Sequence, residues 1–249
     1  MNFEKNILIG TVGYPVRNKK FLSDIDVLEM DEAKHIPPGK KAAKHIKESL
    51  PQNLATIVTL SKYFIKRPDS KISLKGDANA YGDFQVTDET TKLWKRGIDF
   101  ALELNATALV LNTPSHITPS YRTVTSMSSF LKNMDRNGLD IFWEPHGPWE
   151  RSQMEQFARD NNLILAVDPL RDPLFAGETA YFRMGAFAAG GSRMGVYELE
   201  QIAESVAMSN SKTVYCLFDT QRALDDAKNL KDTILSLANG EDDYDEFDY

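Results

Sequence analysis

The sequence predicts a single closed barrel of eight parallel strands with surrounding helices, a (β/α)8 TIM-like fold, followed by a disordered acidic tail. The chain has 249 residues, close to the roughly 250 residues typical of such a barrel. Eight short apolar, β-branched runs follow one another, and most are separated by segments of helical period. Near-continuous apolar runs are typical of strands that are buried on both faces of a parallel sheet.

The predicted strands occupy residues 6–10, 26–30, 55–60, 106–111, 140–143, 163–167, 180–184 and 212–218. Apolar residues recur at helical spacing in residues 88–104, 120–135, 196–208 and 221–237, and a Lys-rich helix is expected at 39–47. Thr87 or Asp88 is placed to cap the helix that starts near residue 88. Residues 11–25 look like an irregular loop and residues 61–87 like a long insertion. We therefore predict one barrel domain over residues 1–239 and a tail over residues 240–249.

The composition is that of a soluble globular protein, with 42% hydrophobic and 26% charged residues. No stretch of about 20 apolar residues is present, so no membrane-spanning helix is expected. The N-terminal residues lack the apolar core and cleavage site of a secretory signal. Cys216 is the single cysteine, which excludes an intramolecular disulfide and a thiolate metal cluster. We expect a cytoplasmic protein.

The net charge of −7 is concentrated at the C-terminus. Six of the acids lie in the last nine residues, EDDYDEFDY, and without them the net charge is close to −1. A nearly neutral body offers no strong field to attract nucleic acid, so a nucleic-acid partner is not supported by charge. The lysines of residues 39–47 are interpreted as a solvated helix face. The tail alternates acids with aromatic residues, a composition suited to docking on a protein partner or to a solubilising end.

Charged residues follow the predicted strands at the end where barrel active sites lie. Glu144 and Asp168 each stand directly before a proline that ends a strand. If the barrel closes as predicted, both carboxylates lie at one rim, and Glu29 in the second strand points towards the same mouth. The other polar candidates near this rim are His146, Arg183, Asn112 and Asp219.

These residues suit several chemistries, and the sequence leaves them open. Glu29, Glu144 and Asp168 are candidate ligands for a divalent metal such as Mg²⁺ or Mn²⁺. Glu144, Asp168, His146 and Arg183 are candidate catalytic residues, through acid–base chemistry or through an Arg clamp on an anionic substrate. The structural alternative is that the acids cap helices or pair with neighbouring arginines. Gly-rich phosphate loops and Ser nucleophile elbows are absent from the sequence.

The chain resembles the YecE-like family, a domain of unknown function, and particularly its archaeal-type branch. The resemblance covers roughly residues 6–230 and rests on several blocks: IGTVGYPVRNKKF, VLEMD, LSKYFIK, the long segment from YGDFQV to NTPSHITP, WEPHG, AVDP, YFRMG and VYCLFDTQRALDDA. It implies a (β/α)8-like fold with a cavity at the strand ends, but it implies little about the reaction.

Residue by residue, Glu29, Glu144, Asp168 and Arg183 match the family pattern. Other positions depart from it: His146 replaces an Arg, Gly185 stands where the family has a His, Asp219-Thr220 replaces an Asn pair, and Asn112 replaces a Gln. Several polar positions of the predicted mouth have therefore changed their chemistry. This indicates either a different ligand or a scaffold that has lost the ancestral activity.

Two functions follow as hypotheses. The first is a metal-assisted hydrolase or phosphodiesterase with its site at the strand ends. The second is a non-catalytic binding or assembly protein that docks partners through its surface and its tail. A carbohydrate or other small-molecule site lined by Trp143, Trp149 and Phe187 is a further alternative. The sequence specifies no substrate, partner or oligomeric state.

Overall fold

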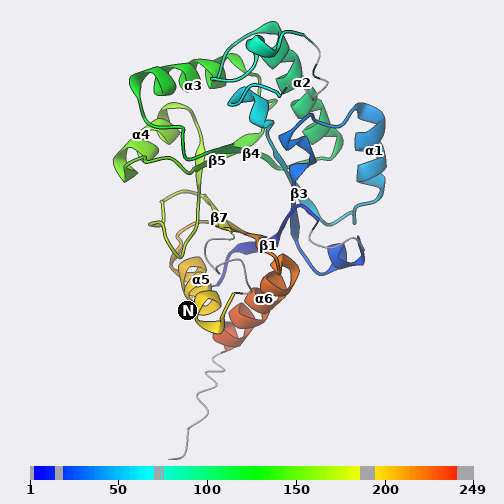
Figure 1. Cartoon of the computed structure of the whole chain (residues 1–249). Coiled ribbons are helices and arrows are strands. Elements are labelled where there is room, and N and C mark those ends of the chain that lie inside the picture. The colour runs from blue at the N-terminus through cyan, green and yellow to red at the C-terminus, as the bar shows by residue number, and fades with distance from the viewer. Residues whose placement is uncertain (1–2, 15–18, 70–73, 75, 186–193, 240–249) are drawn as a thin grey trace, which may run out of the picture. The chain divides into compact units, whose positions relative to one another are not determined.

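The protein is described by a computed structural model that covers residues 3–14, 19–69, 74, 76–185 and 194–239 (Figure 1). Eight strands follow one another in chain order around a closed barrel. They are β1 (Asn6–Val12), β2 (Val27–Met30), β3 (Ala55–Thr59), β4 (Ala108–Thr113), β5 (Asp140–Pro145), β6 (Ile164–Val167), β7 (Thr179–Gly185) and β8 (Thr213–Asp219). The predicted (β/α)8 TIM-like fold is confirmed. Residues 186–193 and the predicted tail over 240–249 lie outside the described residues.

The described α-helices are α1 (Lys40–Glu48), α2 (Asp88–Glu103), α3 (Tyr121–Asn133), α4 (Arg151–Asp160), α5 (Val196–Met208) and α6 (Ala223–Asn239). Among the described residues, four short 3-10 helices accompany them: η1 (Lys19–Ser23), η2 (Asp31–Lys34), η3 (Lys62–Phe64) and η4 (Ala78–Ala80). None of the helices in the described part of the chain is long and apolar enough to cross a membrane.

The chain divides into two compact units. The central unit comprises residues 27–166, and the terminal unit comprises residues 1–26 together with 167–249. In the central unit, β2 to β6 pair in parallel, and α1 to α4 lie outside the strands (Figure 1). In the terminal unit, β8 pairs in parallel with β1 and β7, while α5 and α6 pack side by side (Figure 1).

An aromatic cluster outside the strands forms part of the central unit's core. Phe64 of η3 lies 5.1 Å from Phe130 of α3 and 5.6 Å from Trp94 of α2, measured between ring centroids. Phe84 joins the same cluster, 5.9 Å from Phe130. All four rings are buried. The segment between β3 and α2, predicted as an insertion, is therefore tied to the barrel by apolar burial.

Local sequence signals explain the start of α2. Thr87 caps this helix, because its Oγ1 accepts a hydrogen bond from the Thr90 backbone N–H. In turn, Thr90 Oγ1 accepts a hydrogen bond from the Thr87 backbone N–H. This reciprocal arrangement satisfies two backbone donors that the helix itself leaves unpaired. Of the two caps that the sequence allows, Thr87 is the one used.

The helix α4 was not predicted from the sequence. It is strongly polar, and only Phe157 and Ala158 are buried along its length. Two buried residues give too weak a periodic pattern to mark a helix. Elsewhere the predicted strands differ from the observed ones by one or two residues at their ends, which is where boundaries are least defined.

Candidate active site

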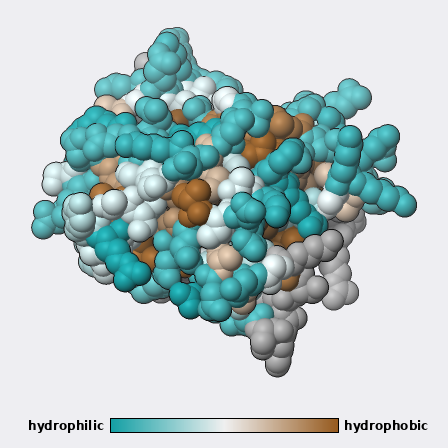
Figure 2. Space-filling model, turned by 90° about the horizontal axis from the view of Figure 1, so that it is seen from above, coloured by the Kyte–Doolittle hydropathy of each residue, from teal (hydrophilic) through white to brown (hydrophobic). Residues whose placement is uncertain are grey.

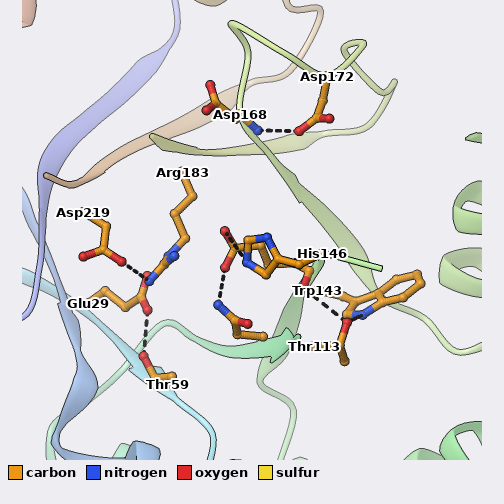
Figure 3. A network of polar contacts seen from close by, with 11 residues as sticks. Glu29, Thr59, Thr113, Trp143, His146, Asp168, Asp172, Arg183 and Asp219 are labelled. Atoms are coloured by element: carbon orange, nitrogen blue, oxygen red, sulfur yellow. Dashed lines mark hydrogen bonds and ion pairs between the residues drawn. The ribbon is translucent and has the colours of Figure 1, made fainter. Parts of the chain in front are cut away.

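A row of three polar side chains in contact lies at the ends of β4 and β5 in the central unit. The strand register places Asn112 directly opposite Glu144. The Asn112 Nδ2 donates to Glu144 Oε2 across 2.6 Å. The second carboxylate oxygen, Glu144 Oε1, lies 3.3 Å from His146 Nε2 (Figure 3). One carboxylate is thus held between an amide and an imidazole.

The burial of these groups differs in a way that suits chemistry. Glu144 is only 7% exposed, whereas the side chain of His146 is 46% exposed. The carboxylate accepts a hydrogen bond from Asn112 on one oxygen and contacts His146 with the other, and these two contacts restrict its orientation. The imidazole that it holds remains accessible to a ligand from solvent. The sequence predicted both residues as catalytic, and the structure brings them together.

The loop that carries His146 is held by contacts with the end of β4 and the loop that follows it. The His146 backbone N–H donates to the Thr113 carbonyl across 2.9 Å, which extends the pairing of β4 and β5. A Cβ at Gly147 would stand 2.1 Å from the Ile117 carbonyl oxygen, so only glycine fits there. Trp149 Nε1 donates to that same carbonyl across 2.9 Å. The loops after β4 and β5 therefore support each other and place the His146 ring.

The tryptophans around this site belong to the core. Trp143 is fully buried, and its Nε1 donates to Thr113 Oγ1 across 3.0 Å (Figure 3). Its ring packs edge-on against Trp149 at 5.0 Å and lies 4.9 Å from Phe157. The alternative in which Trp143 and Trp149 line a ligand cleft is therefore wrong, because both rings are buried against each other and against Phe157. Phe187, the third aromatic of that alternative, lies outside the described residues.

Glu29 is a second buried carboxylate of the central unit. It lies in β2, is completely buried, and its Oε1 accepts a hydrogen bond of 2.7 Å from Thr59 Oγ1 at the end of β3 (Figure 3). Removing a carboxylate from water is costly unless hydrogen bonds compensate it. Thr59 supplies one such bond. Neither Thr59 nor Thr113 was predicted as a site residue, although a threonine at the end of a buried strand is a usable signal.

In the terminal unit, Arg183 of β7 pairs with Asp219 at the end of β8. The Arg183 Nη2 lies 3.1 Å from Asp219 Oδ2 (Figure 3). The Arg183 side chain is 9% exposed and that of Asp219 is 50% exposed. Register places Gly185 opposite Asp219, so the long Arg183 side chain reaches towards the strand end. This ion pair is the arrangement expected if Arg183 has a structural role, as in the alternative that pairs the acids with neighbouring arginines.

Asp168 organises the turn that follows β6. Its Oδ1 accepts a hydrogen bond from the Leu170 N–H at 3.1 Å, and its own N–H donates to Asp172 Oδ2 at 3.0 Å (Figure 3). Its carbonyl also accepts from the N–H groups of Arg171 and Asp172. These bonds are those of a side chain that closes a turn. The catalytic and metal roles of Asp168 stay predictions.

The predicted metal ligands do not gain direct support. In the described parts of the chain, no three side chains of His, Cys, Asp or Glu are grouped so that they could hold a metal ion. The ligand set of Glu29, Glu144 and Asp168 stays a prediction from the sequence. Mg²⁺ is commonly bound by one or two carboxylates together with water and substrate phosphates. Glu144 has the carboxylate oxygens that such a site requires.

Solved structures share this fold. A DUF72 family protein from Enterococcus faecalis matches with a TM-score of 0.66 and 18% identity, over 96% of this chain and 99% of that one. A DUF72 family protein from Thermotoga maritima matches with a TM-score of 0.66 and 14% identity, over 92% and 99%. A xylose isomerase domain containing protein from Salmonella typhimurium matches with a TM-score of 0.56 and 12% identity, over 95% and 98%.

These likenesses agree with the resemblance of the sequence to the YecE-like family and show that the chain has the fold of those proteins. At such low identity they establish the fold alone. No family model and no curated protein matches the sequence. The chemistry must therefore be argued from the site itself.

Proposed function

We propose that the chain is a hydrolase in which His146 acts as general base and general acid and Glu144 positions it, with phosphodiesters as the first substrate class. The observation that carries the proposal is the row Asn112–Glu144–His146, with contacts of 2.6 Å and 3.3 Å. The row places the solvent-accessible imidazole of His146 beside the buried carboxylate of Glu144, which would stabilise the imidazolium form of the ring.

Each member of the row has a defined task in this proposal. His146 takes a proton from an attacking water and becomes imidazolium, and it later returns the proton to the leaving oxygen. Glu144 is a positioning residue that orients the ring and stabilises the imidazolium. Asn112 donates a hydrogen bond to Glu144 Oε2 and so prevents the carboxylate from turning away. This division follows the logic of carboxylate–histidine pairs in acyl-transfer enzymes.

A divalent metal remains part of the proposal in a limited form. Mg²⁺ or Mn²⁺ would supply Lewis-acid stabilisation of charge on a phosphodiester, and the carboxylates predicted from the sequence to hold it are Glu29, Glu144 and Asp168. Charge on phosphate oxygens is the main difficulty in this reaction class. The metal and the acid–base pair are separable by experiment, because one is tested by binding and the other by turnover.

The test measures hydrolysis of bis(4-nitrophenyl) phosphate by the full chain and by His146→Gln and Glu144→Gln. We expect kcat to fall by about 10²–10⁴ in each variant, the usual contribution of acid–base catalysis. Because the two residues act as a unit, the double variant should lose little more than either single one. His45→Gln is the matched control, since His45 is an exposed histidine on α1. Undiminished turnover in His146→Gln would refute the role of the pair.

The alternative of a binding or assembly protein is a defined outcome of the same experiment. Absence of turnover by the wild-type chain on phosphodiesters, phosphomonoesters and carboxylic esters would favour it. The tail that motivates it carries six acids in its last nine residues. A comparison of the full chain with one ending at Gly240 in pull-downs would then show whether the tail selects partners.

A further inference from the structure

A groove of about 450 Å³ lies in the central unit between the turn that precedes α2 and the outer side of α3. Most of its polar lining residues can donate hydrogen bonds: Arg67, Arg122, Gln85, Thr125, Ser126 and Ser129. Asp83 is the single acid among the lining residues. The groove therefore carries a net positive charge.

The turn on one side of the groove is held in an unusual conformation. Gly82, Asp83 and Phe84 all have positive φ angles, of 83°, 53° and 54°. Such angles are disfavoured for residues with a Cβ. The N–H groups of these three residues donate to the carbonyls of Tyr63, Ile65 and Phe64, respectively, at 2.8–2.9 Å. The conformation is thereby fixed, and it buries Phe84 while it leaves Asp83 exposed on the groove side.

The helix on the other side presents its donors in a row. Arg122, Thr125, Ser126 and Ser129 are spaced three and four residues apart, so they share one face of α3. Within the described part of the chain, none of these four side chains has a hydrogen bond or ion pair. On a helix, unpaired hydroxyls beside an unpaired guanidinium leave several donors available to one ligand.

Arg67 is also only weakly engaged. Its guanidinium lies 3.7 Å from Asp83 Oδ2, in a pair whose side chains are 57% and 62% exposed, and 3.3 Å from Asn79 Oδ1. Exposed ion pairs of this length contribute little to stability. A doubly charged anion in the groove would compete with Asp83 for this guanidinium.

We propose that this groove binds a phosphate group, free or as the ester of a small molecule. Guanidinium groups match the oxygens of phosphate by paired, charge-assisted hydrogen bonds, and the hydroxyls of α3 add neutral donors. One wall is the segment between β3 and α2, and the other is the exposed side of α3. This inference goes beyond the proposed function and does not depend on it.

The test is an NMR titration of the full chain with inorganic phosphate and, separately, with glycerol phosphate, at constant ionic strength because exposed charges are screened by salt. We expect saturable shifts of the backbone amides of residues 82–85 and of α3. In Arg122→Gln the Kd should rise by at least about tenfold, which corresponds to roughly 1.4 kcal/mol. Glycerol phosphate binding more tightly than phosphate would identify an ester site, and equal affinity a site for the free ion.

A control variant and separate readouts make the result decisive. Arg159→Gln removes an exposed arginine of α4 that pairs with Glu155 outside the groove, and it should leave the Kd unchanged. The amide shifts of residues 82–85 and α3 report on the groove, whereas turnover reports on His146, so that failure of the catalytic proposal and failure of this one are distinguishable. Shifts that do not saturate, or equal Kd values for Arg122→Gln and Arg159→Gln, would overturn the proposal.

Discussion

The side-chain amide of Asn112 is hydrogen-bonded to the buried carboxylate of Glu144 across 2.6 Å, and this contact joins the ends of β4 and β5. The pairing register that sets Asn112 opposite Glu144 makes it possible. The bond serves stability as well as function, because a buried carboxylate that lacks partners is costly.

Replacing Asn112 by Ala should therefore lower the free energy of unfolding by about 1–3 kcal/mol, the usual cost of leaving a buried polar group without its partner. Urea denaturation measures this change, and an unaltered m-value would show that the unfolded state is comparable. Asn133→Ala is the matched control, because the Asn133 amide bonds the Ser129 carbonyl at an exposed position of α3. Equal stability of Asn112→Ala and Asn133→Ala would contradict the assigned role.

Trp143→Phe tests the interpretation of this tryptophan as core. The substitution removes the Nε1–H bond to Thr113 and part of a ring that is fully buried. We expect a loss of about 2–3 kcal/mol in the free energy of unfolding, from the missing bond and the cavity together. Tyr121→Ala, at a site that is 88% exposed, should change it by less than about 0.5 kcal/mol. A near-neutral Trp143→Phe would instead indicate a ring that packs loosely and can contact ligands.

Much of the fold was predictable from the sequence because most of the buried strands contain near-continuous apolar runs. Runs such as ATIVTL and KTVYCLF mark β3 and β8 to within one or two residues. Helices with a broad apolar face, such as α2 with Leu93, Trp94 and Ile98, were equally visible. The polar helix α4 was not, since packing of Phe157 among aromatic residues from elsewhere in the chain fixes it.

The site was predictable in part for a related reason. Glu144 and His146 are two residues apart, so one strand end necessarily holds both. Their partners come from other strands, and only the register reveals that Asn112 faces Glu144 and that Thr59 bonds Glu29. The use of Asp168 in a turn depends on Leu170 and Asp172 after the proline, where the backbone path cannot be inferred from residue types.

The exposed apolar residues do not identify a partner. On the face that Figure 2 shows, hydrophobic residues appear as small separate areas among hydrophilic ones. The exposed large apolar residues of the described chain include Tyr121 next to α3's cap and Val196 and Tyr197 at the start of α5. Scattered apolar residues of this kind are normal on protein surfaces, so they carry no partner assignment.

The metal component of the proposal predicts a thermal shift. A specific ion at one hundred times its Kd stabilises the folded state by about 2.7 kcal/mol, roughly 5–10 °C in Tm for a chain of this size. We expect Mg²⁺ or Mn²⁺ to raise the Tm of the wild type by this order. Glu144→Ala should show no such shift relative to its own metal-free Tm. Identical melting of the wild type with and without both ions would remove the metal and leave the acid–base pair to stand alone.

Cys216 provides a probe of the closed barrel. It is fully buried in β8, and burial raises the pKa of its thiol far above the ordinary value. Because thiol reagents attack the thiolate, Cys216 should react with a disulfide reagent only when the protein opens. We expect stoichiometric labelling in denaturant and, at pH 8 without denaturant, a rate at least about a hundredfold lower, in keeping with an unfolding free energy of several kcal/mol. Thr91→Cys, at an exposed position of α2, should label at once.

The same shift predicts an alkaline dependence of stability. The folded state binds the Cys216 proton more tightly than the unfolded chain, whose thiol titrates near pH 8.5. Above that pH, unfolding releases a proton, so the free energy of unfolding falls as pH rises, by up to about 1.4 kcal/mol per pH unit. Cys216→Ser retains the size of the side chain and removes the titration, and its stability should be flatter between pH 8.5 and 10. Parallel pH profiles for the two proteins would contradict this prediction, because they would show that the Cys216 thiol is accessible to water in the folded state. In that case Cys216 should also label rapidly without denaturant.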